Sequence, residues 1–460
     1  MRSSRLRSVA PFALAGLVAS MLTSAPAWAQ ALGPWPQFQG GAGHPGASAG
    51  GPAPPYRQAW RFVSPEGAVS GAVIEDDAAI AVGSRTVYGI DVATGKTMWT
   101  LSRNGGPISV PAVGSRAGHP ILVFVEEGAG GRTSLVGVDL DTRRERWRTA
   151  LEASSVGDVT VEGPNAFVGD VEGSVYAVNL ATGEIRWTAD AGGRIEGAVA
   201  VADGTVFVSV PDAAARTVTV RAFEVAGGSS AWSAAQPVGS TAATIPAADE
   251  GTVVVGSSDR VVRGLDDSSG ATRWESVALS PFFTANGGAL DEGSAYIADL
   301  SGGIYRLDAG DGARIWDHQL NDRVVRSSPV VSGSAVLIGL NDGRLVALDA
   351  TDGDLVWESA PSEGLIGAIA VSPRVVIAVK GGSRPGLIAY EHDPEGHLVD
   401  ARSPTIPQPG TLAANFAIAF VACLIVISVP FRLVRDRLGP VDAEVDGDLD
   451  EEEDRGDEEP

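Results

Sequence analysis

The sequence predicts an all-β fold, an eight-bladed β-propeller, and three observations support this prediction. Tryptophan recurs at gaps of 39, 48, 40, 45, 42, 42 and 41 residues, namely at Trp60, Trp99, Trp147, Trp187, Trp232, Trp274, Trp316 and Trp357. A period near 42 residues that contains several short apolar runs is typical of propeller blades. Glycine is abundant, with 58 residues, and charged residues make up only 20 % of the chain. This composition favours short strands joined by tight turns over long charged helices.

Each repeat carries four strand signals. Between residues 324 and 359 the runs VVRSSPVV, AVLIGL, RLVALDA and DLVWES are separated by the turns SG, NDG and TDG. The apolar residues alternate or run continuously, as expected of strands that are buried between neighbouring sheets. The glycines supply the positive φ that tight hairpins need. We therefore expect four-stranded antiparallel blades.

The two ends of the repeat region predict how the ring closes. Asp400 stands where the last repeat should have a tryptophan, whereas Trp60 lies in a strand signal that has no partner before it. An open ring would leave unprotected edge strands. We expect residues 56–64 to form the outer strand of the last blade and residues 365–391 to form its other three. The alternatives are a self-contained last blade that ends at Ala401, with Trp60 on an extra strand, and a ring of seven blades.

The last turn of each repeat combines an acidic or amide residue, a glycine and the tryptophan, as in Asp349, Gly353 and Trp357. The carboxylate can accept hydrogen bonds from the turn. The indole can cover apolar surface between blades while its N–H reaches a carbonyl. A catalytic residue is needed once, whereas these residues recur around the ring. We therefore interpret the eight tryptophans as structural.

The segments outside the repeats predict export and a membrane anchor. Residues 1–29 form a signal peptide, with three early arginines, an apolar run and the cleavage pattern APAWA. Residues 30–55 form an extended Gly/Pro-rich arm, residues 56–401 the propeller, and residues 402–411 a Pro-rich stalk. The 20 apolar residues of 412–431 are long enough for a transmembrane helix.

The residues after this helix predict its orientation. Arg432, Arg435 and Arg437 follow at once, and basic residues remain on the cytoplasmic side. Residues 432–460 are then a basic juxtamembrane segment and a disordered acidic cytoplasmic tail. We expect a single-pass protein of the cytoplasmic membrane whose propeller is extracytoplasmic, either periplasmic or at the cell surface. Cys423, the one cysteine, lies in the predicted span, so the propeller has no disulfide.

Charge and residue spacing argue against two kinds of site. The net charge is −23, and nucleic-acid binding requires a basic surface, so we expect no nucleic-acid partner. The five histidines are scattered and offer no metal-ligand spacing. The stretches NDG and GDVEG look faintly like calcium loops, but they lack the alternating acids of an oxygen cage and are interpreted as hairpins.

One face of the ring is the candidate for binding a ligand or partner. The loops that join the outer strand of one blade to the inner strand of the next gather at one mouth of a propeller channel. Here these loops carry Arg194, Phe282, Phe283, Arg323 and Arg326. The arginines could hold an acidic peptide or glycan. In the alternative interpretation the phenylalanines pack between blades and the arginines pair with Glu196 and Asp322.

The repeats resemble a known family. The stretches VYGIDVATGKTMW, VYAVNLATGEIRW, IYRLDAGDGARIW and LVALDATDGDLVW are similar to the repeat of the pyrroloquinoline-quinone (PQQ) propellers. The segment WPQFQGGAGHPGAS, residues 35–48, resembles the leading segment of secreted PQQ-like repeat proteins. The resemblance covers about residues 35–400 and implies a propeller, but the superfamily includes both enzymes and binding scaffolds.

Two branches of this superfamily imply different functions. Quinoprotein dehydrogenases oxidise alcohols or sugars with PQQ and Ca²⁺, and the resemblance to them implies a vicinal Cys–Cys disulfide in many members, a catalytic Asp and Ca²⁺ ligands from Glu and Asn. This chain has no Cys pair, and its blades are near minimal length. The BamB-like scaffold of outer-membrane protein assembly is a cofactor-free eight-bladed propeller that binds partners through loops on one face. That scaffold is lipid-anchored at an N-terminal Cys, which this chain lacks.

These observations favour a membrane-tethered extracytoplasmic scaffold that binds an unknown envelope protein or polymer and has neither catalysis nor a cofactor. The first alternative is a dehydrogenase of alcohols or sugars that depends on PQQ and Ca²⁺. The second is a single-span surface receptor that signals through the acidic tail.

Overall fold

The structure is a computed structural model that describes residues 35–128, 132–212, 217–237, 244–257, 259–276, 287–320 and 323–398. All of them belong to the compact unit Met1–Ile406, and a second unit, Pro407–Pro460, lies outside them. Within these ranges no helix is long and apolar enough to cross a bilayer. The predicted signal peptide, stalk, transmembrane helix and tail also lie outside the described residues and stay predictions.

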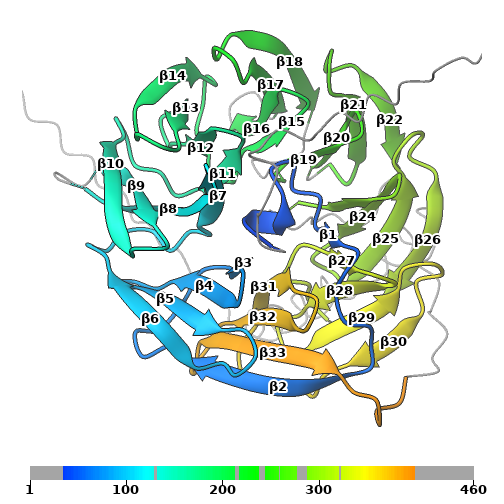
Figure 1. The fold of residues 1–460 in the computed structure, drawn as a ribbon. Coiled ribbons are helices and arrows are strands. Elements are labelled where there is room, and N and C mark those ends of the chain that lie inside the picture. Colours follow the sequence, from blue (N-terminus) through cyan, green and yellow to red (C-terminus); the bar gives the residue numbers. More distant parts are fainter. Residues whose placement is uncertain are drawn as a thin grey trace, which may run out of the picture. The chain divides into compact units, whose positions relative to one another are not determined.

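The described residues form eight blades of four antiparallel strands around a central channel (Figure 1), and one of these sheets carries β1 (Ala47–Ser48) as a fifth, parallel strand. From the inner to the outer strand, the first four blades are β3 (Val73–Glu75), β4 (Ala78–Val82), β5 (Thr86–Asp91) and β6 (Thr97–Ser102); β7 (Ala112–Arg116), β8 (His119–Glu127), β9 (Thr133–Asp139) and β10 (Arg144–Ala150); β11 (Thr160–Glu162), β12 (Asn165–Gly169), β13 (Ser174–Asn179) and β14 (Ile185–Asp190); and β15 (Ala200–Ala202), β16 (Thr205–Asp212), β17 (Thr217–Glu224) and β18 (Ser230–Pro237).

The other four blades follow in the same order. They are β19 (Ala247–Asp249), β20 (Thr252–Gly256), β21 (Val262–Asp266) and β22 (Thr272–Ser276); β23 (Ala289–Asp291), β24 (Ser294–Ala298), β25 (Gly303–Asp308) and β26 (Arg314–Gln319); β27 (Val330–Ser332), β28 (Ala335–Gly339), β29 (Leu345–Asp349) and β30 (Leu355–Glu358); and β31 (Ile366–Val371), β32 (Val376–Lys380), β33 (Gly386–His392) and β2 (Tyr56–Val63). Five of the second strands, β12, β20, β24, β28 and β32, are buried along their whole length, because neighbouring blades cover both of their faces.

The N-terminal strand closes the ring, as the sequence predicts. β2 pairs antiparallel with β33, from Tyr56 opposite His392 to Val63 opposite Gly386. The last blade therefore has the order β2-β33-β32-β31. The structure confirms eight blades rather than seven. It also shows that β2, and not the residues near Ala401, forms the outer strand of the last blade.

Six tryptophans join neighbouring blades in the same way. Their indole N–H groups donate to a carbonyl in the last turn of the next blade, at distances of 2.7–2.9 Å. The donor and acceptor pairs are Trp60 and Val92, Trp147 and Leu180, Trp187 and Val225, Trp232 and Asp267, Trp274 and Ala309, and Trp316 and Ala350. In each pair a glycine of the same turn lies against the indole ring.

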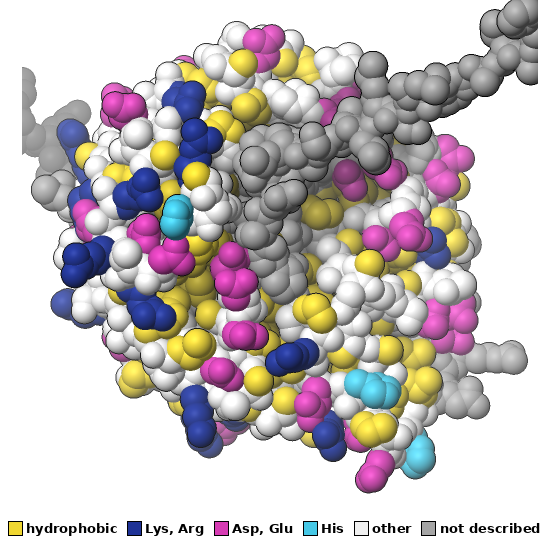
Figure 2. Space-filling model, viewed as in Figure 1, with side chains coloured by type: hydrophobic (Ala, Val, Ile, Leu, Met, Phe, Trp, Pro, Cys, Tyr) yellow, Lys and Arg dark blue, Asp and Glu magenta, His cyan; other side chains and the backbone are white. Residues whose placement is uncertain are grey.

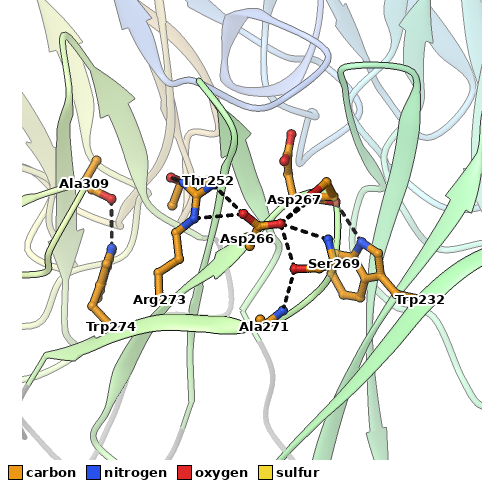
Figure 3. A network of polar contacts seen from close by, with 10 residues as sticks. Trp232, Thr252, Asp266, Asp267, Ser269, Ala271, Arg273, Trp274 and Ala309 are labelled. Atoms are coloured by element: carbon orange, nitrogen blue, oxygen red, sulfur yellow. Dashed lines mark hydrogen bonds and ion pairs between the residues drawn. The ribbon is translucent and has the colours of Figure 1, made fainter.

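Figure 3 shows one of these joints. Trp232 donates to the carbonyl oxygen of Asp267 at 2.7 Å. The neighbouring Asp266 carboxylate accepts a hydrogen bond from the Ser269 backbone N–H at 2.9 Å and pairs with Arg273 at 2.6 Å. The acidic residue therefore fixes the shape of the turn, and the turn presents its carbonyl to the tryptophan.

Two joints are built differently. Trp99 faces a turn in which Arg143, at a φ of 54°, takes the place of the glycine, and the Arg143 guanidinium lies 5.7 Å from the indole centroid. Trp357 faces the closing blade, where β33 and β2 come from opposite ends of the ring. Tyr56 and Tyr390 contact it edge-on, with centroid distances of 5.1 and 5.6 Å. Aromatic packing thus replaces the glycine contact where the ring closes.

Residues 35–48 of the Gly/Pro-rich arm lie inside the ring (Figure 1), although the composition of the arm predicts only an extended segment. We call residues 35–48 the plug; it contains the short 3₁₀ helix η2 (Phe38–Gly40) and β1 (Ala47–Ser48), which pairs parallel with β27. Trp35, Gln37, Gln39 and His44 are buried in it. Close approach to the inner strands explains the glycines, because a Cβ on Gly43 would overlap the carbonyl oxygen of Ala248.

The plug accepts hydrogen bonds from the inner edges of the blades. The second residue of seven successive inner strands donates its N–H to the plug at 2.6–2.8 Å. The donors are Ile74, Val113, Val161, Val201, Ala248, Leu290 and Val331, and the acceptors are the carbonyls of Trp35, Pro36, Ala42, Gly43, Pro45 and Gly46 and the side-chain oxygen of Gln37. Each inner strand is a sheet edge whose buried N–H groups would otherwise lack a partner. The plug therefore stabilises the ring from within.

Candidate functional site: a cavity at the channel mouth

The plug forms the floor of a cavity of about 340 Å³ in the channel. Trp35, Phe38 and Gln39 line it from below. Its walls come from the segments that enter the inner strands, namely residues 68–72, Ile108, Val110, Asp158, Ser328 and Leu365, together with residues 367–369 of β31 and 379–381 at the end of β32. The cavity is therefore built by residues of five blades, which the ring brings to one mouth.

Asp158 is the acidic residue of this lining. Its carboxylate accepts a hydrogen bond from the Val110 backbone N–H at 2.6 Å, which ties the entry segment of β11 to that of β7. Loss of water around the carboxyl raises its pKa to about 6, although the Val110 N–H opposes this shift. No ion pair is formed by Asp158 among the described side chains. The lining therefore contains a carboxylate that forms no ion pair with a described side chain.

Lys380 is the basic residue of the lining, and it is buried. Its ammonium donates to the Ser362 hydroxyl at 2.6 Å, and Ser362 is outside the lining. Desolvation lowers the pKa of Lys380. Lys96 and Lys380 are the two lysines among the 34 basic residues of the chain.

Further polar and apolar groups complete the mouth. The Ser328 hydroxyl is buried and has no hydrogen-bond partner among the described residues. Three apolar side chains on the entry segments are exposed, Ile108 by 38 %, Val156 by 39 % and Leu365 by 37 %. We call these three residues the rim. Ile108 and Leu365 line the cavity, and Val156 lies two residues before the lining residue Asp158. Exposed apolar side chains at a cavity often mark a binding surface.

The three arginines of the sequence-predicted face lie on the same kind of segment but are not among the residues that line the cavity. Arg194 pairs with Glu196 at 2.5 Å, as the structural alternative expected, and both side chains are largely exposed. Arg323 pairs with Glu358 of β30 at 2.5 Å, and Asp322 lies outside the described residues. Arg326 donates its backbone N–H to Gly339. Phe282 and Phe283 lie outside the described residues, so this binding face stays a prediction.

The residues of the channel do not fit the PQQ and Ca²⁺ site that the dehydrogenase branch implies. Among the described residues, the cavity lining has a single carboxylate, Asp158, and neither Asn nor Glu, whereas Ca²⁺ takes six to eight oxygen ligands. The described part of the chain contains no group of three His, Cys, Asp or Glu residues placed to hold a metal ion. A vicinal disulfide is impossible because Cys423 is the one cysteine.

The surface charge is mixed rather than segregated. Figure 2 shows acidic and basic side chains interspersed over one face of the propeller, with apolar side chains exposed between them. Many arginines are paired with acids, for example Arg148 with Glu145 and Arg344 with Asp342. Such exposed pairs contribute little to stability.

Comparison with known proteins establishes the family. The sequence model of the family described as outer membrane protein assembly factor BamB matches residues 131–296 and 300–397, which is more than half of the chain. The chain belongs to this family. Its repeats are PQQ-like propeller repeats, as the sequence predicts. No curated protein matches the chain.

Solved structures share the family's fold at low sequence identity. BamB from Moraxella catarrhalis is 17 % identical, with a TM-score of 0.57 over 73 % of this chain and 100 % of that chain. The quinohemoprotein alcohol dehydrogenase ADHIIG from Pseudomonas putida is 12 % identical, with a TM-score of 0.61 over 82 % of each chain. The quinohemoprotein alcohol dehydrogenase from Comamonas testosteroni is 14 % identical, with a TM-score of 0.60 over 81 % of this chain and 82 % of that chain. At these identities the likeness shows the fold alone.

Sequence reasoning missed the cavity and its charged residues. Asp158 lies in the unremarkable stretch SSVGDVTV, and its partner Val110 is 48 residues away. Lys380 follows a strand signal and has no motif around it. The rarity of lysine in an arginine-rich chain was a signal that could have drawn attention to this position.

Proposed function

We propose that this protein is an extracytoplasmic scaffold that binds a segment of an envelope protein at the channel mouth. The observation that supports this proposal most directly is the exposed apolar rim at a cavity whose floor is formed by the plug. Membership of the BamB family supports a scaffold, and the signal peptide and the span 412–431 support tethering to the cytoplasmic membrane. Catalysis is not part of the proposal, because the lining does not offer the ligands of a PQQ and Ca²⁺ site.

Site-specific photo-crosslinking in the native membrane tests this function. A benzophenone amino acid would replace Ile108 or Val156 in the rim and, as controls, Ile185 or Ile315, which are equally exposed on the outer strands β14 and β26. We expect one and the same partner adduct from both rim positions and none from the controls. Equal adducts from all four positions, or adducts from the outer strands alone, would contradict the proposal.

Cofactor binding provides a separate test of the non-catalytic assignment. The purified protein would be titrated with PQQ in the presence of Ca²⁺, and dye reduction would be followed with alcohols and aldoses as substrates. We expect neither stoichiometric binding nor turnover. Stoichiometric PQQ binding would overturn the assignment in favour of a dehydrogenase.

A further inference from the structure

The charges around the cavity are not equivalent toward a ligand. Asp158 and Lys380 are the two titratable residues of the lining. The Lys380 ammonium is already bonded to Ser362, outside the lining. The Asp158 carboxylate accepts one hydrogen bond, from Val110, and a carboxylate can accept about four. Neither charge is neutralised by an ion pair among the described residues, and the Asp158 carboxylate has about three acceptor positions left for a cation.

The other lining groups also suit a cation. The aromatic rings of Trp35 and Phe38 belong to the floor, and aromatic faces attract ammonium and guanidinium groups. The Ser328 hydroxyl, buried and without a partner among the described residues, adds an oxygen acceptor. A desolvated carboxylate gains most from an opposite charge that arrives with its own hydrogen-bond donors.

We propose that the cavity receives a lysine or arginine side chain that is flanked by apolar residues in an extended segment of the partner protein. The cation is placed against Asp158, and the flanking apolar side chains contact Ile108, Val156 and Leu365. This inference rests on the proposed scaffold function and specifies the sequence that the scaffold recognises. A small free amine would leave the rim exposed, which is why a peptide segment fits better.

Short peptides on the full chain, purified in detergent, test the charge requirement. The probes are acetyl-Leu-Lys-Leu-amide, its norleucine analogue and its glutamate analogue, with affinities measured by calorimetry at pH 7.5. We expect the lysine peptide to bind roughly ten- to a hundredfold more tightly than the norleucine peptide, because a hydrogen-bonded charge pair forms. Equal binding of the two peptides would overturn the inference, as would tightest binding of the glutamate peptide, which would indicate Lys380 instead.

Two variants locate the effect. Asp158→Asn retains an acceptor for the Val110 N–H but removes the charge, so it should abolish the preference for lysine over norleucine. Asp77→Asn removes an exposed carboxylate from the hairpin between β3 and β4, at the end of the blade opposite the entry segments, and should leave the preference unchanged. A preference that survives Asp158→Asn would refute the assignment of this residue.

The pH dependence gives a second readout of the same contact. Protonation of Asp158 removes its charge, so binding of the lysine peptide should weaken as the pH falls through about 6, whereas binding of the norleucine peptide should not change. Lys380, the other titratable residue of the described lining, donates to Ser362, and desolvation lowers its pKa. A lysine-peptide affinity that is flat between pH 5 and 7.5 would contradict the inference.

The two proposals fail in different ways. If the rim positions crosslink a partner while the lysine and norleucine peptides bind equally, the scaffold function stands and the cation inference is wrong. If the lysine peptide binds through Asp158 while no rim adduct forms in the membrane, the cavity is a cation site and the scaffold function is wrong.

Discussion

The joint between blades can be tested with a matched pair of glycines. Gly183 and Gly204 both have a φ of +77°. A Cβ on Gly183 would lie 2.8 Å from the Trp147 Cβ and Cδ2 atoms, whereas a Cβ on Gly204, in the hairpin between β15 and β16, would meet nothing within 4 Å. Alanine at the two positions therefore imposes the same backbone strain, and only Gly183→Ala disturbs a joint.

The expected magnitudes follow from this geometry. An L-residue in the left-handed region costs about 1–2 kcal/mol, and both variants carry this cost. Overpacking of a filled contact adds about 1–3 kcal/mol, which applies to Gly183→Ala alone. We expect Gly183→Ala to lower the free energy of unfolding by about 2–5 kcal/mol and Gly204→Ala by about 1–2 kcal/mol.

Urea titration followed by far-ultraviolet circular dichroism measures both variants against the parent protein. The midpoint of Gly183→Ala should be clearly lower than that of Gly204→Ala, with the slopes unchanged. Thermal midpoints should differ in the same order, by roughly 1–2 °C per kcal/mol for a domain of this size. Equal midpoints for the two variants would refute the view that the Gly–Trp contact holds neighbouring blades together.

Three further predictions concern the plug and the lysines. Burial lowers the pKa of His44 from 6.5 to about 4, so the contribution of His44 to stability is full above pH 6.5 and is lost as the pH falls toward 4. At pH 4.5 the loss of unfolding free energy relative to the His44→Gln variant should be about 2–3 kcal/mol. Parallel pH profiles of stability for the two proteins would contradict this prediction. Gln37→Ala removes the acceptor of a buried N–H and should lower the free energy of unfolding by about 1–3 kcal/mol in urea titration. The control Gln58→Ala, at an exposed position, should change this free energy by close to nothing. Similar losses in the two variants would contradict a stabilising role of the plug. Lys380 is buried and hydrogen-bonded to Ser362, whereas Lys96 is exposed. Acetic anhydride should therefore acetylate Lys96 first, as followed by mass spectrometry. The reverse order would show that the Lys380 amine is accessible.

The blades and the closure of the ring could be predicted because their signals are local or periodic. Four strand signals per repeat and a tryptophan every 42 residues or so describe contacts within one blade and to the next. The closure followed from two departures from that period, Trp60 without preceding strands and Asp400 in place of a tryptophan. The hydrogen bonds of six tryptophans have the geometry that this interpretation requires.

The plug and the cavity were decided by the tertiary structure alone. The composition of residues 30–55 favours an extended arm, and nothing in it shows that seven inner strands will offer their N–H groups at one place. Asp158 gains its unusual environment from Val110, the plug and the end of β32, which are distant in the sequence and meet only after the ring has closed. The sequence repeat therefore predicts the ring of blades, because each blade contacts its neighbour. The contents of the channel depend on all the blades together, and no local pattern encodes them.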